Sequence, residues 1–407
     1  MTKHILPLGL AACLLLTACG ETPPAAPSAP QSQSVPAASA AEAGQLEYLS
    51  ASPDNIGYGA EGELGFYYIQ DNTDHSNLHF IDEASGQDIV LCSSPSCTHD
   101  SNACPACFAS GPCLAFTGGK LYLLFDISAS GEEPGHIDAM EPDGSGRKTV
   151  YTFAANQSFG GSVAGDGENL YFLLATCEGD SPTMSLARLD LSEGSLTDLC
   201  EVDNSTFLMG VACGKLMVKT IGGEAGTSDS PEDFYTQRHT LKAVDPSTGE
   251  MAPVLDWVQD EYWELVADDT LFLLSAPEGK LRLTVRDLAT GSDSEYDPGL
   301  EVGENGYVMS LARYNGTLLF TVFSPDESGG SSVQRWAYTP ETGELREIKL
   351  YDPVRGYPYQ VMGTMGDKLV VQVPRYSGSD VYSFQQYEYA VCSWQDYLNS
   401  RLPAGTS

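Results

Sequence analysis

A short apolar strand that follows a turn recurs seven times along this chain, at intervals of 46 to 55 residues. A period of about fifty residues is typical of repeat proteins, and a four-stranded propeller blade needs about that length. The spacing therefore predicts an all-β fold, a β-propeller of seven four-stranded blades. The seven copies lie at 66–69, 121–124, 170–173, 216–218, 271–274, 318–321 and 369–371.

Two kinds of turn accompany the apolar strand in each repeat. The first turn, rich in Gly, Asp or Asn, precedes the apolar strand, as at 118–119 and 315–316. The second turn follows the next strand of the repeat, as at 143–146 and 245–249. Glycine recurs because such turns need positive φ. Blade strands run from the central channel outward, so we expect the apolar run to be the second strand and the later turn to join the third and fourth. Helical periodicity is confined to 394–400.

The propeller is predicted to occupy residues 46–400 as a single domain, with a tail at 401–407. The fourth strand of the last blade is poorly marked after Cys392. We therefore expect residues 46–51 (LEYLSA) to close the ring as an outer strand of the last blade.

The N-terminus has the features of a targeting segment. Lys3 and His4 precede an apolar run at 5–15, which is too short to span a bilayer as a mature helix. Small residues then lead directly to Cys19, and this resembles the lipobox of bacterial lipoproteins. The resemblance implies a signal peptide at 1–18, diacylglycerol on the sulfur of Cys19, and attachment to the extracytoplasmic face of the bacterial cell membrane. An ordinary secretory signal is the alternative.

Residues 19–45 begin with Cys19 and are then dominated by Pro, Ala and Ser, with no apolar periodicity. Such a segment cannot bury enough surface to offset its ordering entropy, so a disordered tether is predicted. The whole chain is acidic, with 56 Asp and Glu against 20 Lys and Arg and a net charge of −36. Because this charge repels phosphates, we expect no nucleic-acid partner.

The stretch HIDAMEPDGSGRKTVYTF at 136–153 combines a strand, an Asp-Gly-Ser turn and a strand with basic residues. It resembles the TolB-like family of bacterial propellers. The resemblance implies a role in binding other proteins.

Nine of the 11 cysteines follow Cys19, and five of these nine crowd into residues 92–113. The pattern C-x4-C-x-H-x4-C is similar to one in uncharacterised propeller lipoproteins of Gram-positive anaerobes, although Cys107 is an extra thiol here. Pro95 and Ala106 also fit that pattern. The pattern is formed by Cys92, Cys97, His99 and Cys104.

Three thiolates and one imidazole are a complete tetrahedral ligand set for structural zinc. Disulfides are the competing prediction, because thiols outside the cytoplasm tend to oxidise. Cys107, Cys113 and Cys177 are further disulfide candidates, with Cys113 to Cys177 as one possible bond. An odd count of nine leaves at least one thiol without a disulfide partner. A redox role is the third possibility.

The longer connections are expected on one face of the ring, with the 92–113 segment between the last strand of blade one and the first of blade two. These loops carry His75 and many carboxylates, and exposed aromatic side chains are expected to line a ligand surface. The carboxylates are Asp71, Asp74, Glu132, Glu133, Glu178, Asp180, Glu224, Asp229, Glu232, Asp233 and Asp326. The aromatic candidates are Tyr262, Trp263, Tyr357 and Tyr359.

No H-E-x-x-H, no nucleophile elbow and no phosphate-binding glycine loop occur in the sequence. We name no catalytic residue, and the sequence favours a lipoprotein whose acidic, loop-rich propeller face binds a protein, peptide or glycan. One alternative is a carbohydrate-active enzyme, a glycosidase or lyase, at the channel mouth. A further alternative is a metal-holding or redox protein built on residues 92–113.

Overall fold

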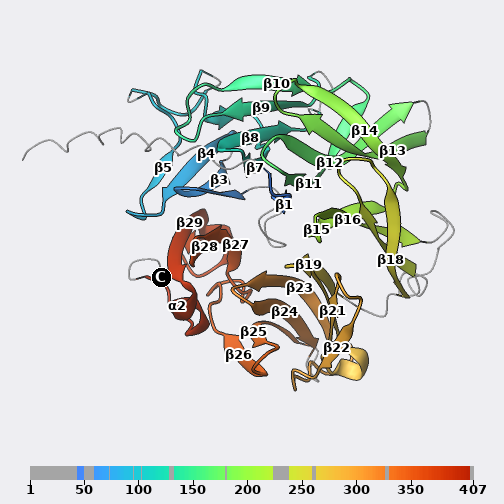
Figure 1. Ribbon diagram of the computed structural model, residues 1–407. Coiled ribbons are helices and arrows are strands. Elements are labelled where there is room, and N and C mark those ends of the chain that lie inside the picture. The colour runs from blue at the N-terminus through green and yellow to red at the C-terminus, as the bar shows by residue number, and fades with distance from the viewer. Residues whose placement is uncertain are drawn as a thin grey trace, which may run out of the picture. The chain divides into compact units, whose positions relative to one another are not determined.

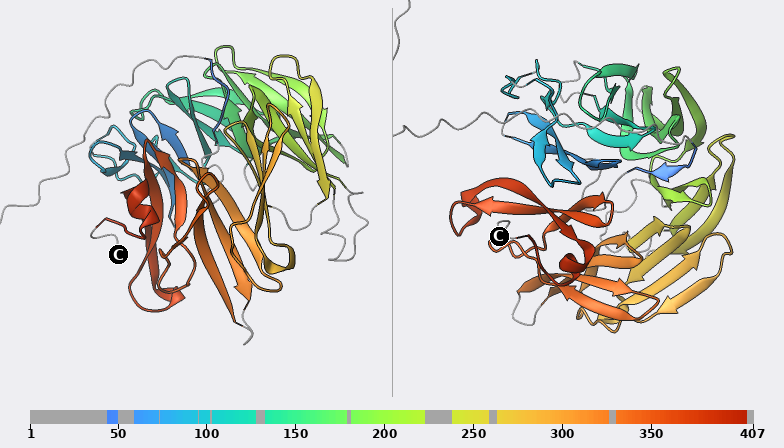
Figure 2. Two further views of the ribbon diagram at one scale, coloured as in Figure 1. Left: turned by 60° about the horizontal axis from the view of Figure 1, so that its bottom comes forward. Right: turned by 60° about the vertical axis from the view of Figure 1, so that its left-hand side comes forward.

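The computed structural model describes residues 44–49, 59–72, 74–94, 96–101, 103–127, 133–178, 181–222, 238–258, 263–325 and 330–403. Within these residues seven antiparallel sheets stand around a central channel (Figures 1 and 2). The predicted seven-bladed β-propeller is therefore confirmed. The proposed signal peptide, Cys19 and most of the tether lie outside the described residues. No helix among the described residues is long and apolar enough to cross a membrane.

The first three blades follow each other along the chain. Blade 1 contains β2 (Gly59–Gly62), β3 (Gly65–Asp71), β4 (Ser76–Asp82) and β5 (Asp88–Val90), with β6 (Cys107–Phe108) also paired to β4. Blade 2 contains β7 (Cys113–Thr117), β8 (Lys120–Phe125), β9 (His136–Met140) and β10 (Lys148–Thr152). Blade 3 contains β11 (Gln157–Gly165), β12 (Asn169–Glu178), β13 (Ser181–Asp190) and β14 (Ser195–Val202).

The remaining blades complete the ring. Blade 4 contains β15 (Thr206–Ala212), β16 (Lys215–Gly222), β17 (Arg238–Val244) and β18 (Met251–Val258). Blade 5 contains β19 (Trp263–Ala267), β20 (Thr270–Ser275), η1 (Pro277–Gly279), β21 (Arg282–Asp287) and β22 (Asp293–Tyr296). Blade 6 contains β23 (Tyr307–Tyr314), β24 (Thr317–Pro325), β25 (Ser331–Thr339) and β26 (Glu344–Ile348). Blade 7 contains β27 (Gln360–Met365), β28 (Lys368–Tyr376), η2 (Val381–Ser383) and β29 (Phe384–Ser393), followed by α2 (Trp394–Leu398).

The repeated apolar run is the second strand of every blade, as predicted. It is apolar along its whole length because a blade is covered on both sides. In β8, Leu121 and Leu123 pack toward blade 1, whereas Tyr122 and Leu124 pack toward blade 3. Side chains of a strand alternate between its two faces, so each run contributes to two cores. Seven apolar clusters of described residues fill the seven seams between neighbouring blades.

The predicted turns join strands one to two and three to four, and we call the end of the propeller where they lie the turn face. The opposite end, where strands two to three and successive blades are connected, is the loop face. Gly249 shows why the hairpin turns need glycine. Its φ is +75°, and a Cβ there would lie 2.2 Å from the carbonyl oxygen of Leu199 in blade 3.

The prediction for residues 46–51 is wrong. The strand β1 (Glu47–Tyr48) pairs with β11 of blade 3, with Glu47 opposite Gly165 and Tyr48 opposite Ala164. This pairing is possible because the channel-facing edge of an innermost strand has no other strand beside it. Tyr48 adds to it by packing into the seam between blades 3 and 4. Blade 7 is left with three strands, and α2 packs against it.

The ring closes between blades 1 and 7 by side-chain packing, without strand exchange among the described residues. Phe66 and Tyr68 of β3 lie in one apolar cluster with Met362 and Val370 of blade 7. The rings of Tyr68 and Tyr389 have centroids 3.9 Å apart. Polar bonds also cross this seam, from the backbone of Gly366 to Glu61 and from Lys368 to the carbonyl of Glu83.

Candidate metal centre and channel mouth

The Cys/His segment is an insertion in the outer strand of blade 1. The chain leaves the sheet after Val90, which pairs with His79 of β4, and returns as β6, where Cys107 pairs with Asn77 of the same strand. The sequence analysis expected the segment on the loop-rich face between two blades. It does connect the outer strand of blade 1 to β7, the first strand of blade 2, as predicted. Within it, β6 pairs with Ser76 and Asn77 at the loop-face end of β4 and so continues the outer edge of blade 1.

The insertion brings together the four predicted metal ligands. One ligand atom from each of Cys92, Cys97, His99 and Cys104 lies within 4.8 Å of the others. Ligands of tetrahedral zinc with bonds of about 2.3 Å lie about 3.7 Å apart, so the cluster needs little rearrangement to hold the ion. The Nδ1 atom of His99 is 3.4 Å from the sulfur of Cys104.

Tight turns put the ligands at these positions. The backbone N–H of Cys97 donates to Ser94, and that of Cys104 donates to Ser101. His99 has a φ of +57°, a left-handed conformation uncommon outside glycine. This conformation lies between the two turns and brings the imidazole back beside the sulfur of Cys104.

The pKa values of two of the ligand thiols are shifted in opposite directions. A hydrogen bond from the backbone N–H of His99 lowers the pKa of the Cys97 thiol. Burial raises the pKa of Cys104 to about 12, because a thiolate is costly away from water. A bound divalent cation supplies the positive charge that keeps a coordinating thiol deprotonated.

The other predicted disulfide candidates lie apart from this cluster. Cys107 is buried in the seam between blades 1 and 2, Cys113 begins β7, and Cys177 is exposed near the end of β12. All nine cysteines of the described residues are free in this structure, and the suggested bond from Cys113 to Cys177 stays a prediction. These are Cys92, Cys97, Cys104, Cys107, Cys113, Cys177, Cys200, Cys213 and Cys392.

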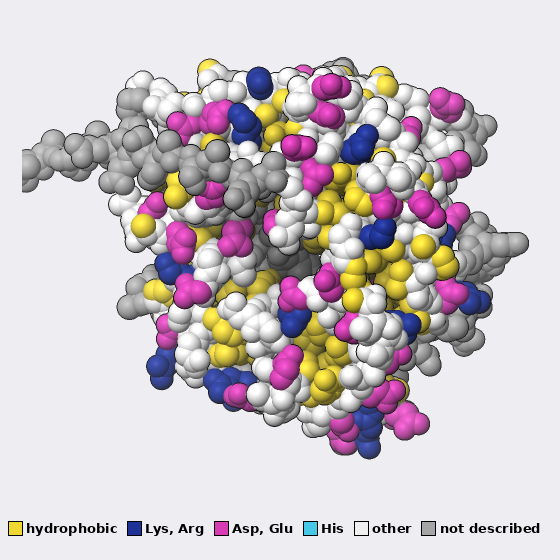
Figure 3. Space-filling view, in the orientation of Figure 1, with side chains coloured by type: hydrophobic (Ala, Val, Ile, Leu, Met, Phe, Trp, Pro, Cys, Tyr) yellow, Lys and Arg dark blue, Asp and Glu magenta, His cyan; other side chains and the backbone are white. Residues whose placement is uncertain are grey.

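A second candidate site is the central channel, a cavity of about 1750 Å³. The innermost strands of all seven blades contribute to its wall, and residues 44–49 form part of it. Figure 3 shows the hollow in one face of the ring, with hydrophobic side chains around it. Gly44 donates its N–H to Asp166 at the turn face, so the chain enters the channel from that side.

Three exposed aromatic side chains stand at the other end of the channel. Phe207, Trp263 and Tyr307 are 50%, 40% and 43% exposed. Each is the first or second residue of the innermost strand of blade 4, 5 or 6. Innermost strands begin at the loop face, so the three residues lie at that end of the ring. The ring of Tyr307 stacks on that of Phe323, with centroids 5.0 Å apart. Phe207 and Trp263 line the cavity directly.

A buried ion pair lies beside these rings, in the seam between blades 4 and 5. The ammonium of Lys219 contacts the carboxylate of Glu264, and both side chains are about one tenth exposed. The same ammonium is 5.7 Å from the ring centroid of Phe207, within cation–π range. Burial lowers the pKa of Lys219 to about 8.

The sequence identified only part of this mouth. Trp263 was predicted and lines the cavity, whereas Tyr262 lies outside the described residues. Tyr357 and Tyr359 lie instead in the connection between blades 6 and 7. Phe207 and Tyr307 were missed, although an aromatic residue at the start of a predicted innermost strand was a usable signal.

The loop carboxylates do not form one site among the described residues. Asp71 accepts a hydrogen bond of 2.6 Å from Ser76, and Asp74 contacts His75 at 2.7 Å. Both carboxylates line a shallow pocket of about 310 Å³ on blade 1. Glu133 and Glu178 are exposed. Glu132, Asp180, Glu224, Asp229, Glu232, Asp233 and Asp326 lie outside the described residues.

No known family profile matches this chain, and no curated protein matches it in sequence. Solved structures do match it. A prolyl endopeptidase has a TM-score of 0.54 and 13% identity, over 88% of this chain and 49% of that one. Oligogalacturonate lyase from Vibrio parahaemolyticus has a TM-score of 0.52 and 10% identity, over 86% of this chain and 92% of that one.

The β-propeller domain of the Trilobed protease from Pyrococcus furiosus, described as having an open velcro topology, has a TM-score of 0.50 and 13% identity. That match covers 89% of this chain and 99% of the domain. TolB from Acinetobacter baumannii is a more distant neighbour, with a TM-score of 0.31 and 13% identity over 71% of this chain and 65% of that one. At these identities the likeness shows the fold alone. The chain spans about half the length of the prolyl endopeptidase. The protein is a β-propeller.

Proposed function

We propose that this protein is an extracytoplasmic binding protein that is anchored to the membrane by lipid on Cys19. It binds a protein, peptide or glycan at its channel mouth. The observation that carries the proposal is the pair of exposed aromatic rings, Phe207 and Trp263, in the wall of a large cavity. Exposed large apolar side chains that gather at a concave surface are typical of a binding site. Aromatic rings also provide contact area at a low cost in conformational entropy.

The polar groups at the mouth support binding. Lys219 and Glu264 lie at the cavity wall, where their ion pair adds charged groups beside the aromatic rings. Other carboxylates of the cavity are engaged in the fold: Asp268 pairs with Arg313, and Glu61 accepts a hydrogen bond from the backbone of Gly366.

A carbohydrate-active enzyme is the second candidate, supported by the position of Glu264 next to the aromatic side chains. A glycosidase needs two carboxyl groups about 5 to 10 Å apart across the scissile bond. Hydrolysis or elimination of an oligosaccharide by the purified protein, lost in Glu264→Gln, would replace the binding proposal with this one.

The binding proposal is tested by calorimetric titration of the full chain with a panel of oligosaccharides and peptides. We expect a ligand whose affinity falls at least tenfold in Trp263→Ala, because truncation of an aromatic anchor costs about 2 kcal/mol or more. Tyr382→Ala is the matched control, because Tyr382 is exposed outside the cavity. Equal losses in both variants would contradict the proposal. Cys19→Ser should release the protein from the membrane fraction.

We further propose that Cys92, Cys97, His99 and Cys104 hold a structural zinc ion. Four protein ligands leave no open coordination position for a substrate, so the ion supplies charge and cross-linking rather than catalysis. Metal analysis and thiol counting on anaerobically purified protein test this. One zinc per chain, lost in Cys97→Ser, supports the site; absence of metal with blocked thiols would favour disulfides.

A further inference from the structure

We infer that Asn77 and Arg147 are positioning residues of the metal centre, and that an ion bound there fastens blade 1 to blade 2. The inference rests on the proposed zinc site. It concerns two side chains that do not ligate the ion but hold the backbone of the segment that carries the ligands.

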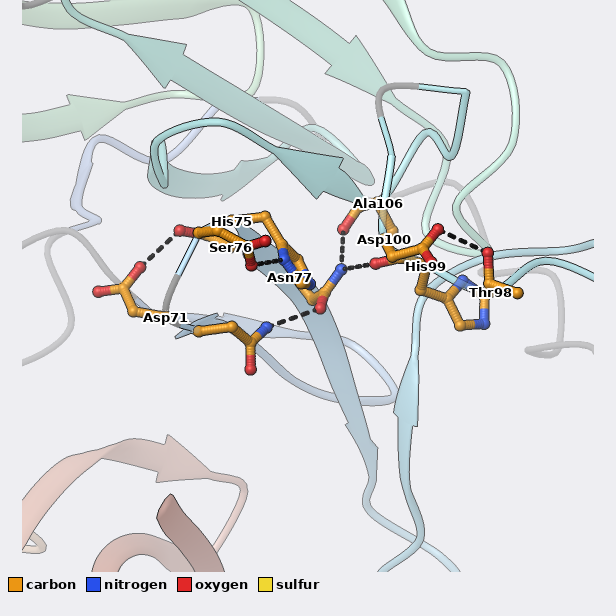
Figure 4. Close-up of polar contacts among 10 residues, drawn as sticks. Asp71, His75, Ser76, Asn77, Thr98, His99, Asp100 and Ala106 are labelled. Carbon is orange, nitrogen blue, oxygen red and sulfur yellow. Dashed lines mark hydrogen bonds and ion pairs between the residues drawn. The ribbon is translucent and has the colours of Figure 1, made fainter. Parts of the chain in front are cut away.

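Asn77 holds the segment from blade 1. It lies near the start of β4 and is 6% exposed. Its Nδ2 atom donates to the carbonyl of His99 at 2.9 Å and to that of Ala106 at 3.3 Å (Figure 4). Its Oδ1 atom accepts a hydrogen bond from Asn72, which orients the amide so that its donors face the insertion.

The bond to His99 has a specific consequence. The left-handed backbone of His99 is uncommon for a residue with a Cβ and needs support from its surroundings. Asn77 provides that support by holding the carbonyl of this residue, and the imidazole is thereby kept beside the sulfur of Cys104. Loss of the amide frees the ring to leave the cluster.

Arg147 holds the segment from blade 2. Its Nη1 atom donates to the carbonyl of Pro105 at 2.9 Å, and its Nε atom donates to Asp138 at 2.7 Å. The guanidinium lies 4.9 Å from the ring centroid of Phe108 and 5.4 Å from that of Phe125. A planar guanidinium fixed by a carboxylate and two rings has little freedom left, so the position of its donor is well defined.

The two side chains meet at the residues that follow Cys104. Blade 2 holds the carbonyl of Pro105 and blade 1 holds that of Ala106. At the other end of the insertion, Leu91 precedes Cys92 and lies against Gly144 of the blade 2 hairpin. The contact is close, because a Cβ on Gly144 would lie 2.7 Å from the carbonyl oxygen of Leu91. Both blades therefore contact both ends of the ligand segment. If metal binding stabilises the seam, the formed seam must raise the metal affinity by the same coupling free energy.

The test measures zinc affinity by chelator competition on the full chain, purified anaerobically, together with the absorption spectrum of the Co²⁺ form. Substitution of residues that orient metal ligands costs about 10- to 100-fold in affinity, and we expect this for Asn77→Ala and Arg147→Ala. The Co²⁺ bands should also shift, because the coordination geometry changes. Arg147→Lys should fall between wild type and Arg147→Ala, because an ammonium can replace only part of the guanidinium contacts.

Matched controls are available in blades 3 and 6, away from the Cys/His insertion. Asn169 donates its amide to Asp166 in a blade 3 turn, and Arg313 pairs with Asp268 and lies 5.0 Å from the ring centroid of Phe272. Asn169→Ala and Arg313→Ala should keep wild-type zinc affinity and Co²⁺ spectrum even where they lower the melting temperature.

The outcomes separate the inference from the zinc proposal. If wild type binds zinc and the Asn77 and Arg147 variants bind it equally tightly with unchanged spectra, the positioning role is wrong and the zinc site stands. If wild type binds no zinc, both are wrong. For variants that fold poorly, hydrogen exchange of the wild type decides: zinc should slow exchange in β5, β6, β9 and β10 together, and protection of β5 and β6 alone would overturn the fastening of the two blades.

Discussion

The seam between blades 1 and 2 and the seam between blades 4 and 5 both contain polar side chains, but they use them in opposite ways. At the outer edge of blade 1, Cys104 is buried and the carbonyls around it are held by Asn77 and Arg147. At the inner edge of blade 5, the Lys219–Glu264 pair lies beside exposed aromatic side chains and an open cavity. A closed polar cluster suits structure, whereas polar groups at the wall of an open apolar cavity suit a ligand.

The largest expected effect comes from breaking the inner pair. Glu264→Gln leaves the ammonium of Lys219 buried without its counter-charge, and this typically costs about 3–5 kcal/mol in the free energy of unfolding. Combining it with Lys219→Met should recover most of the loss, because no uncompensated charge then remains buried. Urea unfolding at pH 7 checks both values. A single variant as stable as wild type would show that water reaches the ammonium freely and that the seam is not closed there.

Removal of the metal should have a somewhat smaller effect. A ligand present at 100 to 1,000 times its dissociation constant stabilises the folded state by about 3–4 kcal/mol, so a chelator should lower the free energy of unfolding by that amount. The loss should come with faster proteolysis of blade 1 and leave ligand binding at the channel mouth unchanged. Loss of ligand binding after chelation would show that the two seams are coupled.

The smallest of the three effects is a pH dependence that belongs to the inner seam alone. Burial lowers the pKa of Lys219 from 10.5 to about 8. Between these values the unfolded chain binds more protons than the folded protein, so the free energy of unfolding contributed by this group rises with pH, by about 3 kcal/mol over the whole window. Below pH 8 the cost of burying the charged ammonium is fully present.

Urea titrations at pH 7.5 and 9.5 measure this rise in wild type against the double variant Lys219→Met, Glu264→Gln, which lacks both charges. The difference in stability between the two proteins should change in favour of wild type at the higher pH. A constant difference would contradict the lowered pKa of Lys219.

Much of the fold could be predicted because its signals are local. The apolar runs and the Gly-containing turns depend on residues within one blade, and strand alternation makes both faces of the second strand apolar. The Cys/His set could be predicted for the same reason, since its four ligands lie within thirteen residues of one another. The place of residues 46–51 could not, because a two-residue strand carries no information about which open edge it joins.

From the sequence alone came the propeller, its number of blades and the identity of four candidate metal ligands, because each is written in spacing along the chain. The tertiary structure decided what lies between distant segments. It placed the Cys/His insertion at the outer edge of the ring, paired Lys219 with Glu264, and brought Phe207 and Trp263 together in the wall of one cavity. Such contacts join different blades, and they are set by how the sheets pack around the channel rather than by any pattern within a repeat.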